Sequence, residues 1–116
     1  MQHNAPLCRT SDLADHDSRG FDPFGEGRDT VLVVRQGDAL FVYRDACPHY
    51  ATPMAWRRHA YLDAARERIV CHAHGAQFDI ASGVCVLGPC LGDRLQALPH
   101  RIDLDGNITL IPEHTL

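Results

Sequence analysis

The stretch "RIVCHAHGAQFDIASGVCVL" (residues 68–87) indicates a β-fold and carries the most distinctive chemistry of the chain. Residues 76–87 predict a hairpin with Ser82-Gly83 in its turn, because glycine accepts the positive φ that tight turns need. Residues 60–71, although helical by propensity, are interpreted as another hairpin, with "YL" and "RIVC" joined over 63–66. Between these hairpins Cys71 and His74 stand three positions apart, with Gly75 directly after them.

Further hairpins are expected on both sides of this stretch. Residues 30–45, "TVLVVRQGDALFVYRD", predict two strands joined at Gln36-Gly37-Asp38. Residues 100–111 predict another pair that turns at Asp105-Gly106, and its alternating apolar residues are expected to bury one face. Those residues are Ile102, Leu104, Ile108 and Leu110. Residues 6–13 are expected to form a short strand, and residues 12–29 an irregular surface excursion. The chain is therefore predicted to be all-β.

Length and composition limit the classes of protein that fit. The 116 residues fit one domain, 1–116, and an apolar fraction of 45% argues against disorder. A net charge of −4 argues against a nucleic-acid partner. No apolar run suits a membrane span, and the start of the chain does not resemble a secretory signal. We therefore expect a cytoplasmic protein; its oligomeric state is left open.

Cysteine and histidine are arranged in a pattern typical of a metal site. Five cysteines, an odd number, indicate metal binding or free thiols in a reducing compartment rather than a disulfide framework. Cys47-x-His49 is followed after 21 residues by Cys71-x-x-His74, so two turns can approach one centre. Thiolate and neutral imidazole both bind iron and zinc. A structural zinc site is the alternative, but zinc fingers usually space their ligands as C-x₂₋₄-C and H-x₃₋₅-H.

These motifs resemble the Rieske-type [2Fe–2S] proteins. The resemblance rests on Cys47-Pro48-His49, Cys71-His72-Ala73-His74-Gly75, Phe78-Asp79, Gly83 and Gly88-Pro89. It implies a Rieske-like β-sandwich or partial barrel with a two-hairpin cluster-binding subdomain at about 46–90. It also implies a [2Fe–2S] cluster with Cys47 and Cys71 on one iron and His49 and His74 on the other. Two neutral imidazoles in place of thiolates raise the reduction potential above that of an all-cysteine cluster.

The chain departs from the respiratory members of that family at four positions. Where those proteins have a disulfide between the cluster loops, this chain has Thr52 and Ala73. Where they have serine and tyrosine hydroxyls that donate to the cluster side, it has Ala76 and Phe78. Because fewer donors stabilise the reduced cluster less, we expect a potential at the low end of the Rieske range, roughly −150 to 0 mV.

The resemblance implies a small soluble one-electron carrier rather than an independent enzyme. Its expected partners are a flavoprotein reductase as donor and an oxygenase or related oxidoreductase as acceptor. Two alternatives remain at this stage: a Rieske-like accessory subunit of a reductase complex, and a zinc-stabilised interaction module.

Other reactive side chains receive plainer interpretations. Cys85 and Cys90 fit a redox pair or spare ligands, but they and Cys8 are interpreted as small buried apolar residues. Gly88-Pro89 is expected to shield the cluster, and Trp56-Arg57-Arg58 is interpreted as surface packing rather than a docking site. The remaining histidines are expected at the surface: His3, His16, His59, His72, His100 and His114.

Overall fold

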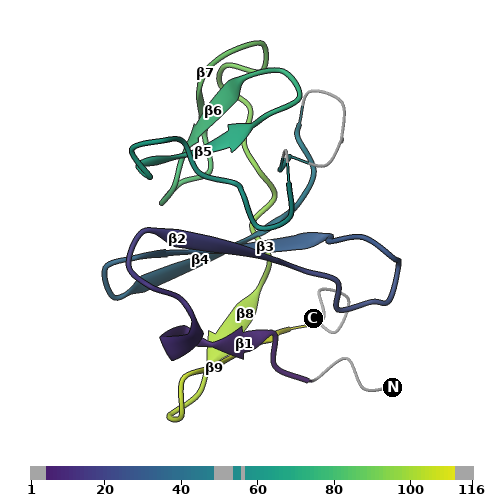
Figure 1. The fold of residues 1–116 in the computed structure, drawn as a ribbon, viewed down its shortest axis with the longest axis vertical. Helices are drawn as coiled ribbons and strands as arrows, with labels where there is room; N and C mark the ends of the chain where they lie inside the picture. The colour runs from purple at the N-terminus through teal and green to yellow at the C-terminus, as the bar shows by residue number, and fades with distance from the viewer. Residues whose placement is uncertain (1–4, 49–53, 56, 112–116) are drawn as a thin grey trace.

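A computed structural model, which describes residues 5–48, 54–55 and 57–111, shows three antiparallel sheets stacked in layers (Figure 1). The middle sheet has the order β2-β3-β4, with β5-β6-β7 above it and β1-β9-β8 below it in this view. The predicted all-β fold is confirmed. The elements are β1 (Cys8–Arg9), a short 3₁₀ helix (Thr10–Asp12), β2 (Asp17–Phe21), β3 (Val31–Gln36), β4 (Ala39–Arg44), β5 (Arg68–Cys71), β6 (Ala76–Asp79), β7 (Cys85–Leu87), β8 (His100–Ile102) and β9 (Asn107–Leu110).

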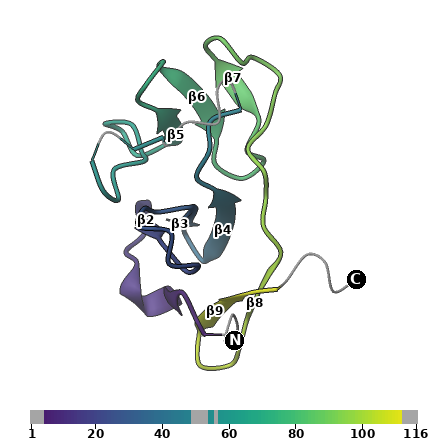
Figure 2. The ribbon, with the colours of Figure 1, turned by 90° about the vertical axis from the view of Figure 1, so that its right-hand side faces the viewer.

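Strand β3 separates two hydrophobic cores. All four residues from Val31 to Val34 are buried, because neighbouring side chains of a strand point to opposite faces and both faces of β3 are covered. Leu32 and Val34 belong to the core shared with the β5-β6-β7 sheet, whereas Val31 and Val33 belong to the core shared with β9. The turned view in Figure 2 shows the same three layers from the side.

The predicted hairpins are confirmed, although Gln36, expected in the first turn, belongs to β3. β3 and β4 pair along their full length from Val31–Arg44 to Gln36–Ala39, so the turn falls at Gly37-Asp38. A bridge between Leu62 and Ile69 joins the two halves of residues 60–71 as a hairpin rather than a helix. β6 pairs with β7, with an irregularity at Gln77/Phe78, and β8 pairs with β9.

The expected surface excursion at residues 12–29 is wrong in its centre. Residues Asp17–Phe21 form β2, which pairs with β3 along its full length. Its inward residues are Ser18 and Gly20, and Gly20 has no room for a side chain because a Cβ there would lie 2.5 Å from the Tyr61 hydroxyl. A strand whose buried side is Ser and Gly shows no apolar alternation, which is the signal that sequence reading depends on.

The ends of the lower sheet also differ from expectation. In the 100–111 hairpin Ile108 is buried, but Ile102 is 45% exposed and Leu104 is fully exposed. Leu104 lies in the turn beyond β8, which the Asp103 carboxylate organises by accepting the backbone N–H groups of Asp105 and Asn107, both at 2.9 Å. The expected strand at 6–13 is limited to Cys8–Arg9, since the 3₁₀ helix begins at Thr10.

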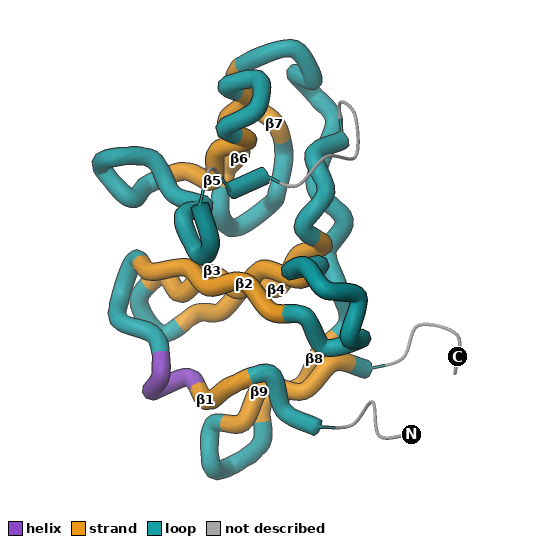
Figure 3. Tube along the Cα trace, turned by 45° about the vertical axis from the view of Figure 1, so that its right-hand side comes forward, coloured by secondary structure: helices purple, strands orange, loops and turns teal. Residues whose placement is uncertain are grey.

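One long connection joins the upper and lower sheets. After β7 the chain follows the free edge of β4, where Arg44 N–H donates to the Gln96 carbonyl at 2.9 Å and Leu98 N–H donates to the Val42 carbonyl at 3.0 Å. Figure 3 shows that loops make up most of the upper layer around β5, β6 and β7. That layer is therefore held by hydrogen bonds between loops as well as by strand pairing.

Candidate metal centre

Two loops of the upper layer bring two buried cysteines together. Cys47 follows β4, and Cys71 ends β5; neither has any solvent-exposed surface. Their thiol groups are hydrogen-bond neighbours, and burial followed by this contact raises the pKa of Cys71 above its ordinary value. Such a thiol releases its proton when it binds a metal cation, because a coordinating thiol is deprotonated outright. The pair therefore matches two sulfur ligands of one metal ion.

The turn after Cys71 aims backbone donors at its sulfur. The N–H groups of His74 and Gly75 donate to the Cys71 carbonyl at 3.3 and 2.7 Å, and Gly75 completes the turn with a φ of 78°. The N–H groups of Ala73 and His74 also hydrogen-bond to the Cys71 thiol, and both lower its pKa. Backbone donors to a thiolate stabilise its negative charge, so this turn suits a sulfur ligand.

A buried carboxylate ties the first loop to the core. Asp45, only 4% exposed, accepts the Tyr61 hydroxyl at 2.7 Å and the Met54 N–H at 2.9 Å. Burial raises the pKa of Asp45, although the bonds from Tyr61 and Met54 oppose this. The Met54 carbonyl in turn accepts the His72 N–H at 2.9 Å. The backbone of Met54 therefore connects the loop of Cys47 with the loop of Cys71.

Sequence reasoning missed these three supporting residues. Asp45, Met54 and Tyr61 are not adjacent in the chain, and neither their residue types nor their spacing forms a recognisable motif. A carboxylate beside the first cysteine motif would ordinarily be expected at the surface. Only the folded structure shows that Asp45 is buried and accepts a hydrogen bond from Tyr61.

The histidines of the motif are described only in part. His74 is exposed on the turn after Cys71, and His49 lies outside the described residues, as do Thr52 and Trp56. Within the described ranges no three His, Cys, Asp or Glu side chains are grouped so that they could hold a metal ion. The structure thus brings Cys47 and Cys71 together and leaves the predicted His49 contribution untested.

Four histidines that were expected at the surface are partly buried: His16, His59, His72 and His100. His72 is half-buried with its Nε2 enclosed by protein, and this burial lowers its pKa. His59 is partly buried: its Nδ1 accepts the Gly20 N–H at 2.9 Å, and its carbonyl accepts the Ser18 hydroxyl at 2.8 Å. His59 therefore fastens β2 to the segment before β5. His16 and His100 are partly exposed, and His3 and His114 lie outside the described residues.

The Gly88-Pro89 loop packs against the end of the loop that carries Cys71 and His74, here called the second ligand loop; the loop of Cys47 is the first. A Cβ on Gly88, whose φ is 109°, would lie 2.8 Å from the Cα of Ala76. Ala76 and Phe78, the two positions without a hydroxyl, are fully buried. Cys85 and Cys90 are buried as interpreted, whereas Cys8 is only half-buried and its pKa is raised, mainly by burial.

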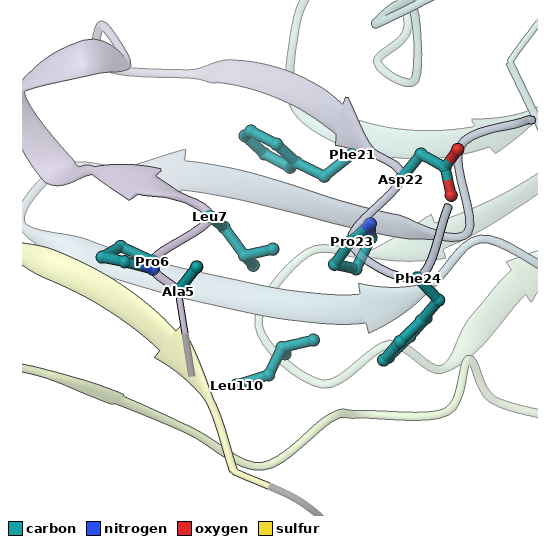
Figure 4. A pocket seen from close by; sticks show the side chains of 8 residues that line it. All are labelled: Ala5, Pro6, Leu7, Phe21, Asp22, Pro23, Phe24 and Leu110. Atoms are coloured by element: carbon teal, nitrogen blue, oxygen red, sulfur yellow. The ribbon is translucent and has the colours of Figure 1, made fainter. Parts of the chain in front are cut away.

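Two surface hollows among the described residues are formed by other parts of the chain. One, of about 220 Å³, is lined by the N-terminal Ala5–Leu7, by Phe21–Phe24 and by Leu110 (Figure 4). The other, of about 400 Å³, includes Arg58 and Asp29, which are joined by two hydrogen bonds of 2.9 and 3.1 Å. Neither of these two hollows includes a cysteine.

Residues 3–112 of the sequence match the family model of the Rieske [2Fe–2S] domain. The chain belongs to the Rieske [2Fe–2S] domain family. Its cofactor is therefore a [2Fe–2S] cluster, a group that carries electrons. No protein with a curated description matches the sequence.

Solved structures show the same fold at low sequence identity. The ferredoxin of carbazole 1,9a-dioxygenase from Nocardioides aromaticivorans IC177 is 23% identical, with a TM-score of 0.69 over 95% of this chain and 98% of that one. A Sphingomonas yanoikuyae B1 ferredoxin is 22% identical, with a TM-score of 0.67 over 94% and 98%. A cyanobacterial plasma membrane Rieske protein from Synechocystis PCC 6803 is 22% identical, with a TM-score of 0.67 over 93% of this chain and 99% of that one.

The residues present fit the cluster that the family implies. A buried pair of thiols supplied by separate loops, with backbone donors aimed at one sulfur and an exposed imidazole on the adjoining turn, is a donor set for iron. No helix within residues 5–48, 54–55 and 57–111 is long and apolar enough to cross a membrane.

Proposed function

We propose that Cys47 and Cys71 bind one iron of the cluster and that His49 and His74 bind the other. The observation that carries this assignment is the contact between the two buried cysteines, which come from loops 24 positions apart in the sequence. His74 is exposed on the turn that Cys71 begins. The His49 assignment rests on the sequence motif alone.

This arrangement suits electron transfer to another protein. The cluster supplies a centre that gains and loses one electron at a time. Cys47 and Cys71 are buried away from water, and the N–H groups of Ala73 and His74 would stabilise the negative charge of the Cys71 sulfur. Exposed His74 gives a short route for an electron to a protein docked on this end.

The proposed potential is at the low end of the Rieske range, roughly −150 to 0 mV. Ala76 and Phe78 are fully buried beside the second loop, and neither side chain has a hydroxyl group to donate. A redox titration of the purified protein measures the value. A clearly positive midpoint would contradict the proposal, because it would require donors to the cluster that these side chains lack.

The proposed partners are a reductase that supplies electrons and an oxygenase or related oxidoreductase that accepts them. A solved complex of a reduced oxygenase and an oxidised ferredoxin in carbazole 1,9a-dioxygenase supports the acceptor class. It matches this chain with 23% identity and a TM-score of 0.73, over 100% of this chain and 99% of that one. We further propose a single domain, 1–116, with the cluster subdomain at about 46–90, acting in the cytoplasm.

The ligand assignment is tested by counting iron and acid-labile sulfide in matched variants. Cys71→Ser is expected to lose the cluster and its visible absorbance, because serine replaces a sulfur ligand. Cys8→Ser is the control, since Cys8 pairs with Ile108 in the lower sheet and should keep full iron content. A Cys71→Ser protein that retains two irons per chain, or a colourless wild type with zinc, would overturn the assignment.

A further inference from the structure

Two cysteines outside the proposed ligand set touch each other. Cys85 and Cys90 are 1% and 3% exposed. The Cys90 thiol donates a hydrogen bond to the Cys85 sulfur at 3.2 Å, and the Cys85 thiol donates to the Leu87 carbonyl at 3.3 Å. A single buried cysteine needs no special explanation, but two buried thiols in contact form a pair that can exchange two electrons.

The loop around this pair is closed by its own backbone. Cys85 N–H donates to the Asp93 carbonyl at 2.7 Å, and Gly92 N–H donates to the Cys85 carbonyl at 3.1 Å. Asp93 N–H donates to the Cys90 carbonyl at 2.8 Å. These bonds hold both cysteine backbones on one ring of residues. The two sulfurs are therefore held together by the fold itself, independently of any metal.

The pair is chemically separate from the proposed ligands, although it shares their core. Cys47, Cys71, Cys85 and Cys90 all belong to the core above β3. Burial and then the Cys85 neighbour raise the pKa of Cys90 to about 12, with a smaller contribution from Cys47. In reducing conditions Cys90 therefore keeps its proton and donates it in the hydrogen bond to the Cys85 sulfur.

We propose that Cys85 and Cys90 form a dithiol–disulfide redox site, oxidised by hydrogen peroxide or a similarly small peroxide. One thiol first gives up its proton and its sulfur attacks the peroxide: an S–O bond forms, the O–O bond breaks, a sulfenic acid results and the displaced oxygen leaves as water. The second thiol then attacks that sulfur, an S–S bond forms, and a second water leaves. Both thiol protons end in the two waters, two electrons pass from the sulfurs to the peroxide, and no other reactant is needed.

The geometry favours this product over other outcomes. The sulfurs are 3.2 Å apart, and an S–S bond of about 2.05 Å requires them to approach by only about 1 Å. Burial excludes glutathione and proteins more strongly than it excludes peroxide. A nearby second thiol also traps a sulfenic acid before further oxidation.

The disulfide would fasten the loop that rests on the second ligand loop. Gly88 lies between the two cysteines and contacts Ala76, the first residue after the His74-Gly75 turn. Oxidation removes the hydrogen bond from the Cys85 thiol to the Leu87 carbonyl. The loop, which hydrogen bonds hold in the reduced protein, is then also closed by a covalent bond. The site thus records peroxide exposure beside the loop of Cys71 and His74.

Peptide mapping tests the proposal on the full-length, anaerobically purified protein. The protein is treated with hydrogen peroxide, denatured, alkylated and cut before aspartate, which releases residues 79–92 with Cys85 and Cys90 but without Cys47 or Cys71. The expected fragment carries no alkyl group and is about 2 Da lighter than the fully reduced fragment, the mass of two hydrogens. Treatment with dithiothreitol before alkylation should restore two alkyl groups.

Matched variants and the metal count separate this proposal from the ligand assignment. Cys85→Ser and Cys90→Ser should each abolish the light fragment, whereas Cys8→Ser should retain it. Two alkyl groups on the fragment after peroxide, oxidation to sulfinic acid, or bonding of Cys85 to Cys47 would overturn the proposal. Iron analysis is a separate measurement that tests the ligand assignment, whereas the peptide masses test the disulfide, so either proposal can fail without the other.

Discussion

The two cores on either side of β3 are built from different chemistry. The lower core is formed by aliphatic side chains: Leu13, Val31, Val33, Val42 and Ile108. The upper core contains four cysteines and two tyrosines, and buried Asp45 is tied to one of them, Tyr61. Both cores exclude water equally well, so burial alone does not explain why they differ.

The difference follows from what each core must hold. The lower core packs strands β3, β4 and β9 together, and apolar packing, which has no preferred direction, is enough for that. The upper core must fix two loops, and loops have few strand hydrogen bonds to fix them. Asp45, Tyr61 and the Met54 backbone supply directional bonds in their place. The following predictions use matched changes in the two cores to test this distinction.

Identical truncations in the two cores should separate stability from cluster retention. Ile69→Ala in the upper core and Ile108→Ala in the lower core each remove a fully buried side chain and should each cost about 4 kcal/mol of unfolding free energy. Only Ile69→Ala should speed the release of iron to a chelator, because β5 leads directly into Cys71. Urea unfolding and the rate of bleaching measure the two effects; equal bleaching rates would contradict the distinction.

Removing the buried carboxylate should loosen both ligand loops. Asp45→Ala leaves the Tyr61 hydroxyl and the Met54 N–H without their acceptor, at a cost of about 3 kcal/mol. Asp45→Asn is the matched control, since its amide oxygen preserves one acceptor, and it should lose about half as much. Thermal unfolding measures both. An Asp45→Ala protein as stable as wild type would show that the loops do not depend on this tie.

Two glycines of one loop distinguish close packing from backbone strain. Gly92→Ala meets no atom within 4 Å and should cost only the strain of its φ of 91°, about 1 kcal/mol. Gly88→Ala must also push against the Ala76 backbone, 2.8 Å away, and should cost about 2 kcal/mol. Gly88→Ala should in addition accelerate iron release. If both variants behave alike, the loop does not press on the second ligand loop.

The smallest expected effect is a pH dependence from His59. Burial, then the charge of Arg58, lowers the pKa of His59 below its ordinary 6.5 in the folded protein. The unfolded chain therefore binds this proton more readily, and the stability from neutral His59 is present above pH 6.5 and lost as pH falls through the folded pKa. Unfolding in urea at several pH values should show a shallower acid decline for His59→Asn, which keeps an acceptor and tolerates the φ of 72°. An identical decline would exclude His59 as a contributor.

Much of this fold was predictable because its turns have clear signals. Gly37, Gly83 and Gly106 mark three hairpins, and their positive φ values explain why glycine is placed there. Strand β2 was not predictable, since its buried residues are Ser18 and Gly20, and Gly20 faces a space already occupied by Tyr61 and Asp29. Its partner strands determine its structure, and a pattern confined to its own residues does not reveal it.

The site was predictable to the extent that its motif is local. Cys71 and His74 share one turn, and the sequence shows their spacing directly. The two spaced pairs already indicated that the loops of Cys47 and Cys71 can approach one centre, and the resemblance to a known family implied that both cysteines bind the same iron. The Asp45–Tyr61 bond and the Cys90–Cys85 contact are results of packing, for which residue spacing carries no signal.

Pulsed EPR of the dithionite-reduced protein tests the proposed two-cysteine, two-histidine site most directly. The expected result is a rhombic signal whose average g value is below that of the free electron, with hyperfine coupling to two imidazole nitrogens. His74→Cys should remove one of these couplings while leaving any from His49. A [2Fe–2S] signal without nitrogen coupling in the wild type would contradict the proposed histidine ligands, and a colourless protein that holds zinc would contradict the cluster itself.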